Sequence, residues 1–230
     1  MFSRFHLRPD WDGLPGWAGV SPMSLPPMPS KQQGKHARYH PVLRISKDTG
    51  QREITWMREG LIPSYACDEE GAEQRVEAHA EAMTCDSCFR SAFRRRRCIV
   101  PAHSIVERRH LGTGIEHPCS FQLESAEMFG IAAVWETWTN DQGHAVDSFA
   151  IVTVLVVPAL RTLFDRMPVV ITDPADQERW LHIADNHEDT PVDLLRALSV
   201  SELRAWRMTP GNVDLQLQPD TWRVESPSIR

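Results

Sequence analysis

The sequence predicts an α+β fold in which peripheral helices surround a largely antiparallel, barrel-like sheet. Short strand-like segments follow one another along most of the chain, and a few amphipathic helical patterns lie among and after them. No internal repeat is visible, which excludes solenoid and propeller architectures. The chain has 230 residues, of which 41% are hydrophobic. It can therefore bury one sizeable core, and we expect a single domain over residues 1–230.

A hairpin is the first regular element that we expect. Residues 9–35 are rich in proline and glycine, so they are expected to form an irregular loop over the surface. Strand-like segments follow at 40–46 and 53–58, and the Lys-Asp-Thr-Gly segment at 47–50 predicts a turn between them.

A helix is expected at 87–95, where Phe89, Ala92 and Phe93 have helical spacing and Asp86 or Ser87 is the expected N-cap. Further strands are expected at 98–106, 121–123, 130–135, 149–157 and 213–217, and further helices at 158–164, 174–183 and 191–198.

A candidate binding residue follows the longest apolar run. The segment 149–157 is apolar at successive positions, which is typical of a strand buried on both faces, so the turn behind it has a rigid support. Asp165 and Arg166 lie in that turn. Arg166 could bind a phosphate or carboxylate through two nitrogens, with Asp165 holding the guanidinium in place. The alternative is that the pair only stabilises a loop.

Charge is unevenly distributed. The formal net charge of −6 argues against a protein that coats nucleic acid by bulk electrostatics. Five arginines nevertheless form a dense cationic segment at Arg90, Arg94, Arg95, Arg96 and Arg97. An acidic protein with one basic face can bind a polyanion weakly and with a steep salt dependence, whereas a solvated, arginine-rich helix end is the alternative.

The cysteines indicate reduced thiols. There are five, at Cys67, Cys85, Cys88, Cys98 and Cys119, which is an odd number for a disulfide framework. Cys85 and Cys88 form a lone C-x-x-C pair, which is too few ligands for a structural zinc, so neither a metal nor a cofactor is expected. Without an apolar signal segment at the N-terminus or a stretch long enough to cross a bilayer, we expect a cytoplasmic protein with no membrane partner.

Five phrases occur together in the order and spacing of one known family: Met1-Phe2-Ser3-Arg4-Phe5; Gly60-Leu61-Ile62-Pro63-Ser64; Phe89-Arg90-x-Ala92-Phe93 followed by Arg97-Cys98-Ile99-Val100-Pro101-Ala102; Val134-Trp135-Glu136-x-Trp138; and Asp165-Arg166-Met167-Pro168 with Trp180-Leu181 behind it. They resemble the SOS response-associated peptidase (SRAP) family of abasic-site processing proteins. The resemblance runs from Met1 to about Leu181. We expect a C-terminal helix and strand within 182–230 to complete the domain.

The resemblance implies chemistry at the N-terminus. In this family, removal of the initiator methionine exposes a cysteine that condenses with the ring-opened aldehyde of an abasic site in single-stranded DNA. Its α-amine, with a pKa of about 8, forms a Schiff base, and its thiol then closes a stable thiazolidine ring. An Asn, a Glu and a His in the pocket assist proton transfer and place the sugar.

The chain departs from this pattern at most of the family's catalytic positions. Phe2 stands at the position of the nucleophilic cysteine, Glu77 at that of the Asn and Phe164 at that of the His. The Glu position is retained as Glu107, which is either a proton-transfer group or an exposed acid in a salt-bridged loop. The residues that the resemblance places against DNA are Arg4, His79, Arg97, Thr153 and Arg166. His79 replaces an arginine that binds phosphate, and it is either a phosphate contact or a neutral polar residue of the wall.

The resemblance, with these departures, predicts a catalytically degenerate relative in the DNA damage response. We expect it to bind single-stranded DNA weakly and without the stable crosslink, because Phe2 has no thiol. Two alternatives stay open. The amine of Met1 could form a reversible Schiff base in a lyase-type reaction, with Glu107 moving protons. The chain could instead be a non-enzymatic interaction protein whose groove Glu59 and Glu77 have made acidic.

Trp135 and Trp138 lie in one of the family phrases and have two interpretations. They could form a platform on which bases stack, but aromatic side chains at strand ends more often fill a core. We therefore expect both to be core residues.

Overall fold

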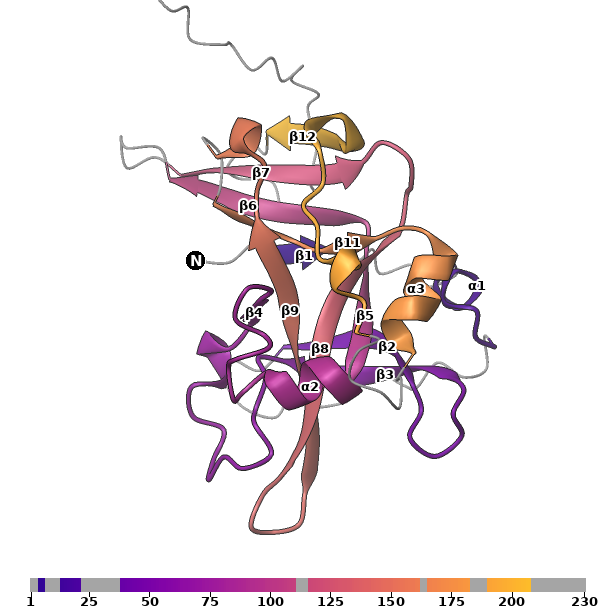
Figure 1. Ribbon diagram of the computed structural model, residues 1–230, viewed down its shortest axis with the longest axis vertical. Helices are drawn as coiled ribbons and strands as arrows, with labels where there is room; N and C mark the ends of the chain where they lie inside the picture. The colour runs from indigo at the N-terminus through magenta and orange to yellow at the C-terminus, as the bar shows by residue number, and fades with distance from the viewer. Residues whose placement is uncertain are drawn as a thin grey trace, which may run out of the picture.

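The centre of the computed structural model, which describes residues 4–6, 13–21, 38–110, 116–161, 165–182 and 190–207, is a five-stranded barrel (Figure 1). It closes through β9 (Ala145–Leu155), which pairs with both β3 (Arg52–Glu59) and β8 (Phe129–Thr139). The strands β2 (Tyr39–Ile45) and β5 (Arg97–Ala102) complete the circle in the order β9-β3-β2-β5-β8. All neighbours are antiparallel except the parallel pair β3–β9. The predicted fold class is confirmed.

The hairpin of β2 and β3 confirms the predicted turn at 47–50. Ile45 pairs with Arg52, so the two strands separate directly at the turn. Gly50 has a φ of 68°, a left-handed conformation that glycine adopts without strain, and its N–H donates to the carbonyl of Ser46 over 3.0 Å. Four consecutive turn residues therefore determine the register of the whole hairpin.

The strands β8 and β9 are buried over most of their length, at 129–136 and 148–154. One face of each strand looks into the barrel, and helices cover part of the outside, so apolar side chains are stable on both faces. The helix α2 (Arg90–Arg95) packs on β5 and β8, and α3 (Pro174–Leu181) packs on β5. Trp180 of α3 is fully buried, and its Nε1 donates to the carbonyl of Cys98 in β5 over 2.9 Å.

Three short strands extend the barrel. The carboxyl half of β9 pairs with β4 (Glu77–His79) in parallel and with β10 (Arg166–Pro168) in antiparallel orientation. The strand β11 (Val170–Ile171) pairs with the first residues of β8. The end of β9 therefore lies between two short strands that come from distant parts of the chain.

A second sheet lies beside the barrel, with β6 and β7 at the top of Figure 1. Its order is β1-β6-β7-β12, formed by β1 (Arg4–His6), β6 (Ser104–His110), β7 (Glu116–Leu123) and β12 (Leu203–Arg207). Ile105, Phe121 and Leu123 of this sheet belong to the same hydrophobic cluster as the barrel strands. The two sheets therefore share one core.

Several predicted elements differ in the structure. The single strand expected at 98–106 is divided at His103 into β5 and β6, because the chain leaves the barrel there to join the second sheet. The helix expected at 87–95 begins only at Arg90, and Asp86 Oδ1 accepts the N–H of Cys88 in a local turn over 2.8 Å rather than capping the helix. The helix expected at 191–198 is reduced to a 3-10 turn, Val192–Leu194.

Other differences concern short elements. The loop expected at 9–35 contains α1 (Leu14–Ala18) in its described part. Of the helix expected at 158–164, the described residues form the 3-10 turn Pro158–Leu160. The strand β12 was not predicted, and the strand predicted at 213–217 lies outside the described residues. Further 3-10 turns are Ala72–Gln74 and Val200–Glu202.

Candidate functional site

Four residues singled out in the sequence meet at the carboxyl end of β9. Thr153 of β9 pairs with His79 of β4 on one edge and with Pro168 of β10 on the other. Glu77 lies two residues before His79, on the same face of β4. Arg166 begins β10 and pairs with Leu155, two residues beyond Thr153. Strand pairing therefore brings an acid, an imidazole, a hydroxyl and a guanidinium together.

The guanidinium of Arg166 is held on two sides. Its Nε donates to Thr153 Oγ1 over 3.1 Å, and its Nη2 donates to the carbonyl of Thr153 over 2.8 Å and to Glu81 Oε2 over 2.6 Å. The prediction that Asp165 orients this guanidinium is wrong. Asp165 is exposed, and its carbonyl continues the ladder by accepting the N–H of Val156 over 3.0 Å. Successive strand residues point to opposite faces, so Asp165 points away from Arg166.

Thr153 connects Arg166 to the acid on β4. The Thr153 hydroxyl, which accepts from Arg166, donates to Glu77 Oε2 over 3.4 Å, and this carboxylate lies 3.8 Å from His79 Nε2. Thr153 is 1% exposed, whereas about half of the His79 side chain is accessible. The buried Thr153 hydroxyl therefore joins the side chains of Arg166 and Glu77, which are both partly exposed.

Glu81 is the residue of this group that sequence analysis missed. Partial burial raises the pKa of its carboxyl, but the hydrogen bond from Arg166 and the backbone N–H groups of Glu81 and Leu155 outweigh this, and the pKa lies below its ordinary value of 4.5. Glu77 and His79 share one face of β4, whereas Glu81 lies in the turn directly after this strand, where no strand periodicity in the sequence could place it. With Glu77, the group has two carboxylates against the one guanidinium of Arg166.

The other predicted site residues lie elsewhere. Arg4 pairs with Val106, next to Glu107, so both predicted residues belong to the second sheet. The side chains of Arg4 and Glu107, and all of Phe2 and Phe164, lie outside what the structure describes. The end of β9 points toward β6 and β1 in Figure 1.

Arg97, for which the sequence predicted a DNA contact, is buried and bonds to backbone carbonyls of two helices. It is 3% exposed, and its Nε donates to the carbonyl of Trp180 over 2.6 Å, while Nη1 donates to the carbonyl of Phe93 over 2.9 Å. Nη2 donates to the carbonyl of His182. Burial lowers the pKa of Arg97 to about 10, so it stays charged at neutral pH. The guanidinium joins the carboxyl ends of α2 and α3 and is not accessible to a phosphate.

Fewer arginines of the cationic segment are available to an anion in the structure than the sequence suggests. Arg96 Nη2 pairs with Glu136 Oε2 at 2.5 Å. Arg90, Arg94 and Arg95 are exposed, and their guanidinium groups have no ion-pair partner among the residues that the structure describes. These three residues are the part of the segment available to an anion.

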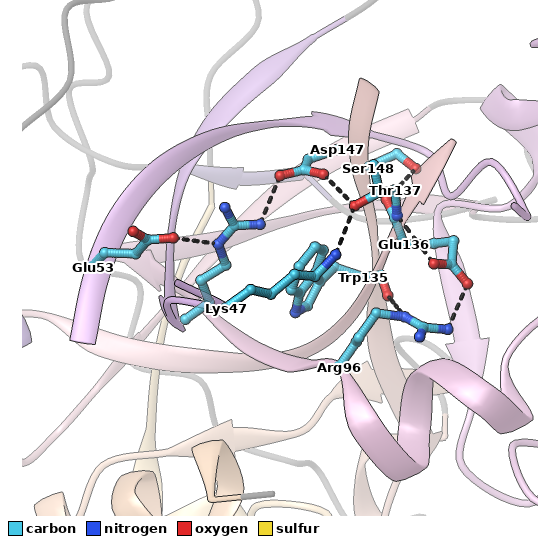
Figure 2. Close-up of polar contacts among 9 residues, drawn as sticks. Lys47, Glu53, Arg96, Trp135, Glu136, Thr137, Asp147 and Ser148 are labelled. Atoms are coloured by element: carbon cyan, nitrogen blue, oxygen red, sulfur yellow. Dashed lines mark hydrogen bonds and ion pairs between the residues drawn. The ribbon is translucent and has the colours of Figure 1, made fainter. Parts of the chain in front are cut away.

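Trp135 and Trp138 are core residues, as expected, with 3% and 4% of their surface exposed. Figure 2 shows the polar network around Trp135, in which the Lys47 ammonium lies 4.6 Å from the ring centroid. The Arg44 guanidinium lies 4.3 Å from the same ring and is paired with Asp147 at 2.6 Å. Cation–π contacts and ion pairs thus cover the ring, so it is not a platform for a base.

Three further findings concern the described residues alone. No group of three or more His, Cys, Asp or Glu side chains in them is arranged to hold a metal ion. None of their helices combines the length and the apolar character that a membrane span requires. Cys67, Cys85, Cys88 and Cys98 are free thiols.

Comparison with known proteins gives a consistent result. The family model described as SOS response associated peptidase (SRAP) matches residues 20–211. The abasic site processing protein YoqW of Bacillus subtilis is 28% identical over 180 residues, which cover 74% of this chain and 80% of YoqW. The abasic site processing protein YoaM of the same organism is 29% identical over 168 residues, which cover 73% of this chain and 74% of YoaM.

Solved structures share the fold. A protein from Bordetella bronchiseptica matches with a TM-score of 0.70 and 21% identity over 90% of this chain and 100% of its own. A protein from Bacteroides thetaiotaomicron matches with a TM-score of 0.67 and 23% identity over 75% of each chain.

Proposed function

This chain belongs to the SOS response-associated peptidase family, and from that premise we propose that it binds single-stranded DNA in the response to DNA damage without forming a stable crosslink. The relatives YoqW and YoaM are named as abasic site processing proteins, which supports a role connected with damaged DNA.

The observation that carries the proposal is the position of Arg166. Thr153 holds its Nε and Nη2 from within the sheet, so the guanidinium has a defined direction at the end of β9. Within the described residues Nη1 of Arg166 has no hydrogen-bond partner. A preorganised arginine of this kind can bind a backbone phosphate, and phosphate contacts supply most sequence-independent affinity for DNA.

Phe2, at the position of the family's nucleophilic cysteine, argues against the stable crosslink. Closing a thiazolidine requires an amine and a thiol on the same residue, and Phe2 has no thiol. The exposed thiols of Cys67 and Cys85 cannot take this role, because neither residue carries the α-amine. Binding is therefore expected to be reversible.

Fluorescence anisotropy with a short abasic single strand tests the binding. Arg166→Ala should weaken binding by about 1–3 kcal/mol, the range for a charge-assisted hydrogen bond. Arg179→Ala is the matched control, because Arg179 is also paired with carboxylates, Asp176 and Asp193, but lies on α3. The affinity should also fall steeply between low and physiological salt. Equal affinities of the two variants would contradict the proposal.

A denaturing gel separates the kinds of complex. We expect no heat-stable band after incubation with the abasic strand, and a band that survives hydroxylamine without reductant would overturn the expectation. A band that appears only with borohydride would identify a Schiff base at the Met1 amine, with Glu107 as the candidate proton-transfer group.

One observation favours a second candidate function. Glu77 accepts from Thr153 and Glu81 accepts from Arg166, so two carboxylates lie in a group with one guanidinium, and the group by itself has no net positive charge to attract DNA. A non-enzymatic interaction protein with a different partner is consistent with that balance. Absence of DNA binding even at low salt would support this candidate over the first.

A further inference from the structure

Glu81 already occupies the place where an anion would contact Arg166. Its Oε2 lies 2.6 Å from Arg166 Nη2, the shortest of the three hydrogen bonds that Arg166 makes with the residues that the structure describes. The Glu81 side chain is 52% exposed, whereas that of Arg166 is 19% exposed. The Glu81 carboxylate can therefore rotate into solvent, whereas Thr153 holds the Arg166 guanidinium in place.

The donors around this carboxylate form a small anion seat. Arg166 Nη2 donates from β10, and the backbone N–H groups of Leu155 and of Glu81 itself also interact with the carboxylate. A phosphate oxygen needs the same kind of donors, namely a guanidinium and backbone N–H groups. A phosphate bound through both Nη1, which has no partner among the described residues, and Nη2 needs the position on Nη2 that Glu81 occupies, so a phosphate bound in this way and the Glu81 carboxylate exclude each other.

We propose that Glu81 is a specificity-determining residue, an internal carboxylate that occupies the anion seat of Arg166 until a phosphate displaces it. The proposal rests on the proposed function for the identity of the ligand, a phosphate of the DNA backbone. Displacement exchanges one anion for another on Arg166, so only part of the new contact adds to affinity. A single phosphate therefore binds weakly, and a DNA strand that offers several phosphates at once is favoured over it.

Removing the charge of Glu81 tests the proposal. Glu81→Gln keeps the size of the side chain and should tighten binding of the abasic strand, measured by anisotropy, roughly three- to fivefold, the factor that corresponds to losing a competing ion pair. Glu178→Gln is the matched control, because Glu178 is an exposed acid paired with Arg52 at 2.5 Å, and it makes the same change in net charge. This control should change the affinity less than about twofold.

Inorganic phosphate provides a test that does not need DNA. Its binding can be followed by NMR through the Nε–H resonance of Arg166, and Glu81→Gln should bind phosphate more tightly than the natural chain. In the double variant Glu81→Gln, Arg166→Ala the gain should be lost. Phosphate and DNA affinities of Glu81→Gln that equal those of Glu178→Gln would overturn the proposal, and so would weaker binding, which would make Glu81 a positioning residue for Arg166.

The outcomes separate this inference from the proposed function. Tighter phosphate binding by Glu81→Gln, with no variant binding DNA, would support the anion seat and refute the DNA ligand. DNA binding that depends on Arg166 but does not increase in Glu81→Gln would support the proposed function and refute the role of Glu81. Thermal melting of each variant confirms that folded proteins are compared.

Discussion

Replacing Arg97 by alanine should destabilise the fold rather than abolish DNA binding. The guanidinium donates to carbonyls at the carboxyl ends of both α2 and α3, where a cation also interacts favourably with the helix dipoles. These helices cover β5 and contribute Phe93 and Trp180 to the core. Loss of Arg97 therefore loosens two helices at once and leaves buried carbonyls without partners.

The expected magnitude follows from the contacts. A hydrogen bond from a charged donor contributes about 1.5–3 kcal/mol. The bonds of Arg97 to Trp180 and Phe93, at 2.6 and 2.9 Å, are both buried, so water does not replace them. Losing both should reduce the free energy of unfolding by about 3–6 kcal/mol, a large part of the total stability of a typical domain. Arg97→Lys should lose about half of this, because an ammonium keeps the charge but cannot span both helix ends.

Urea denaturation followed by tryptophan fluorescence measures these differences. Arg95→Ala is the control, since Arg95 is an exposed neighbour on α2, and we expect a change within about 0.5 kcal/mol. The reasoning would be refuted if Arg97→Ala kept the stability of the natural chain and the folded variant bound single-stranded DNA more weakly. In that case Arg97 would contact DNA, as the sequence alone predicted.

Three other predictions concern Gly60, Glu81 and Phe2. Gly60→Ala should lower the Tm sharply, because Gly60 has a φ of 95° and a Cβ there would lie 2.3 Å from the carbonyl oxygen of Ala72; an unchanged Tm would contradict this. The pKa of Glu81 is lowered in the folded state, so its stabilising effect is present above 4.5 and is lost as the pH falls through the lowered value. The Tm difference between the natural chain and Glu81→Gln should therefore disappear in acid, and a constant difference would argue against the ion pair. Phe2→Cys alone should not restore a heat-stable crosslink on a denaturing gel, because Glu77 stands at the Asn position of the family; a strong band would show that the thiol suffices.

Local patterns in the sequence were enough to predict several elements. The turn at 47–50 and the apolar run 149–157 depend on residues that are neighbours in the chain. The turn agrees with the structure, and residues 149–155 of the apolar run lie in β9, which begins at Ala145 and ends at Leu155. The ordered family phrases, which end in Trp180 and Leu181, predicted the family, and the succession of strand-like segments with a few amphipathic helices predicted the fold class. Turn geometry and side-chain periodicity act over a few residues, so one sequence carries them explicitly.

The arrangement of the candidate site was decided only by tertiary structure. Asp165 is next to Arg166 in the chain, yet the carboxylate that contacts Arg166 belongs to Glu81, 85 residues away. Strand alternation turns Asp165 to the opposite face, and β4 is too short to be recognised until it pairs with β9. Arg97 looked like one arginine among several, and only the packing of α2 and α3 on β5 buries it. Which charged group meets which depends on the pairing of distant strands, and that pairing is set by burial of the common core.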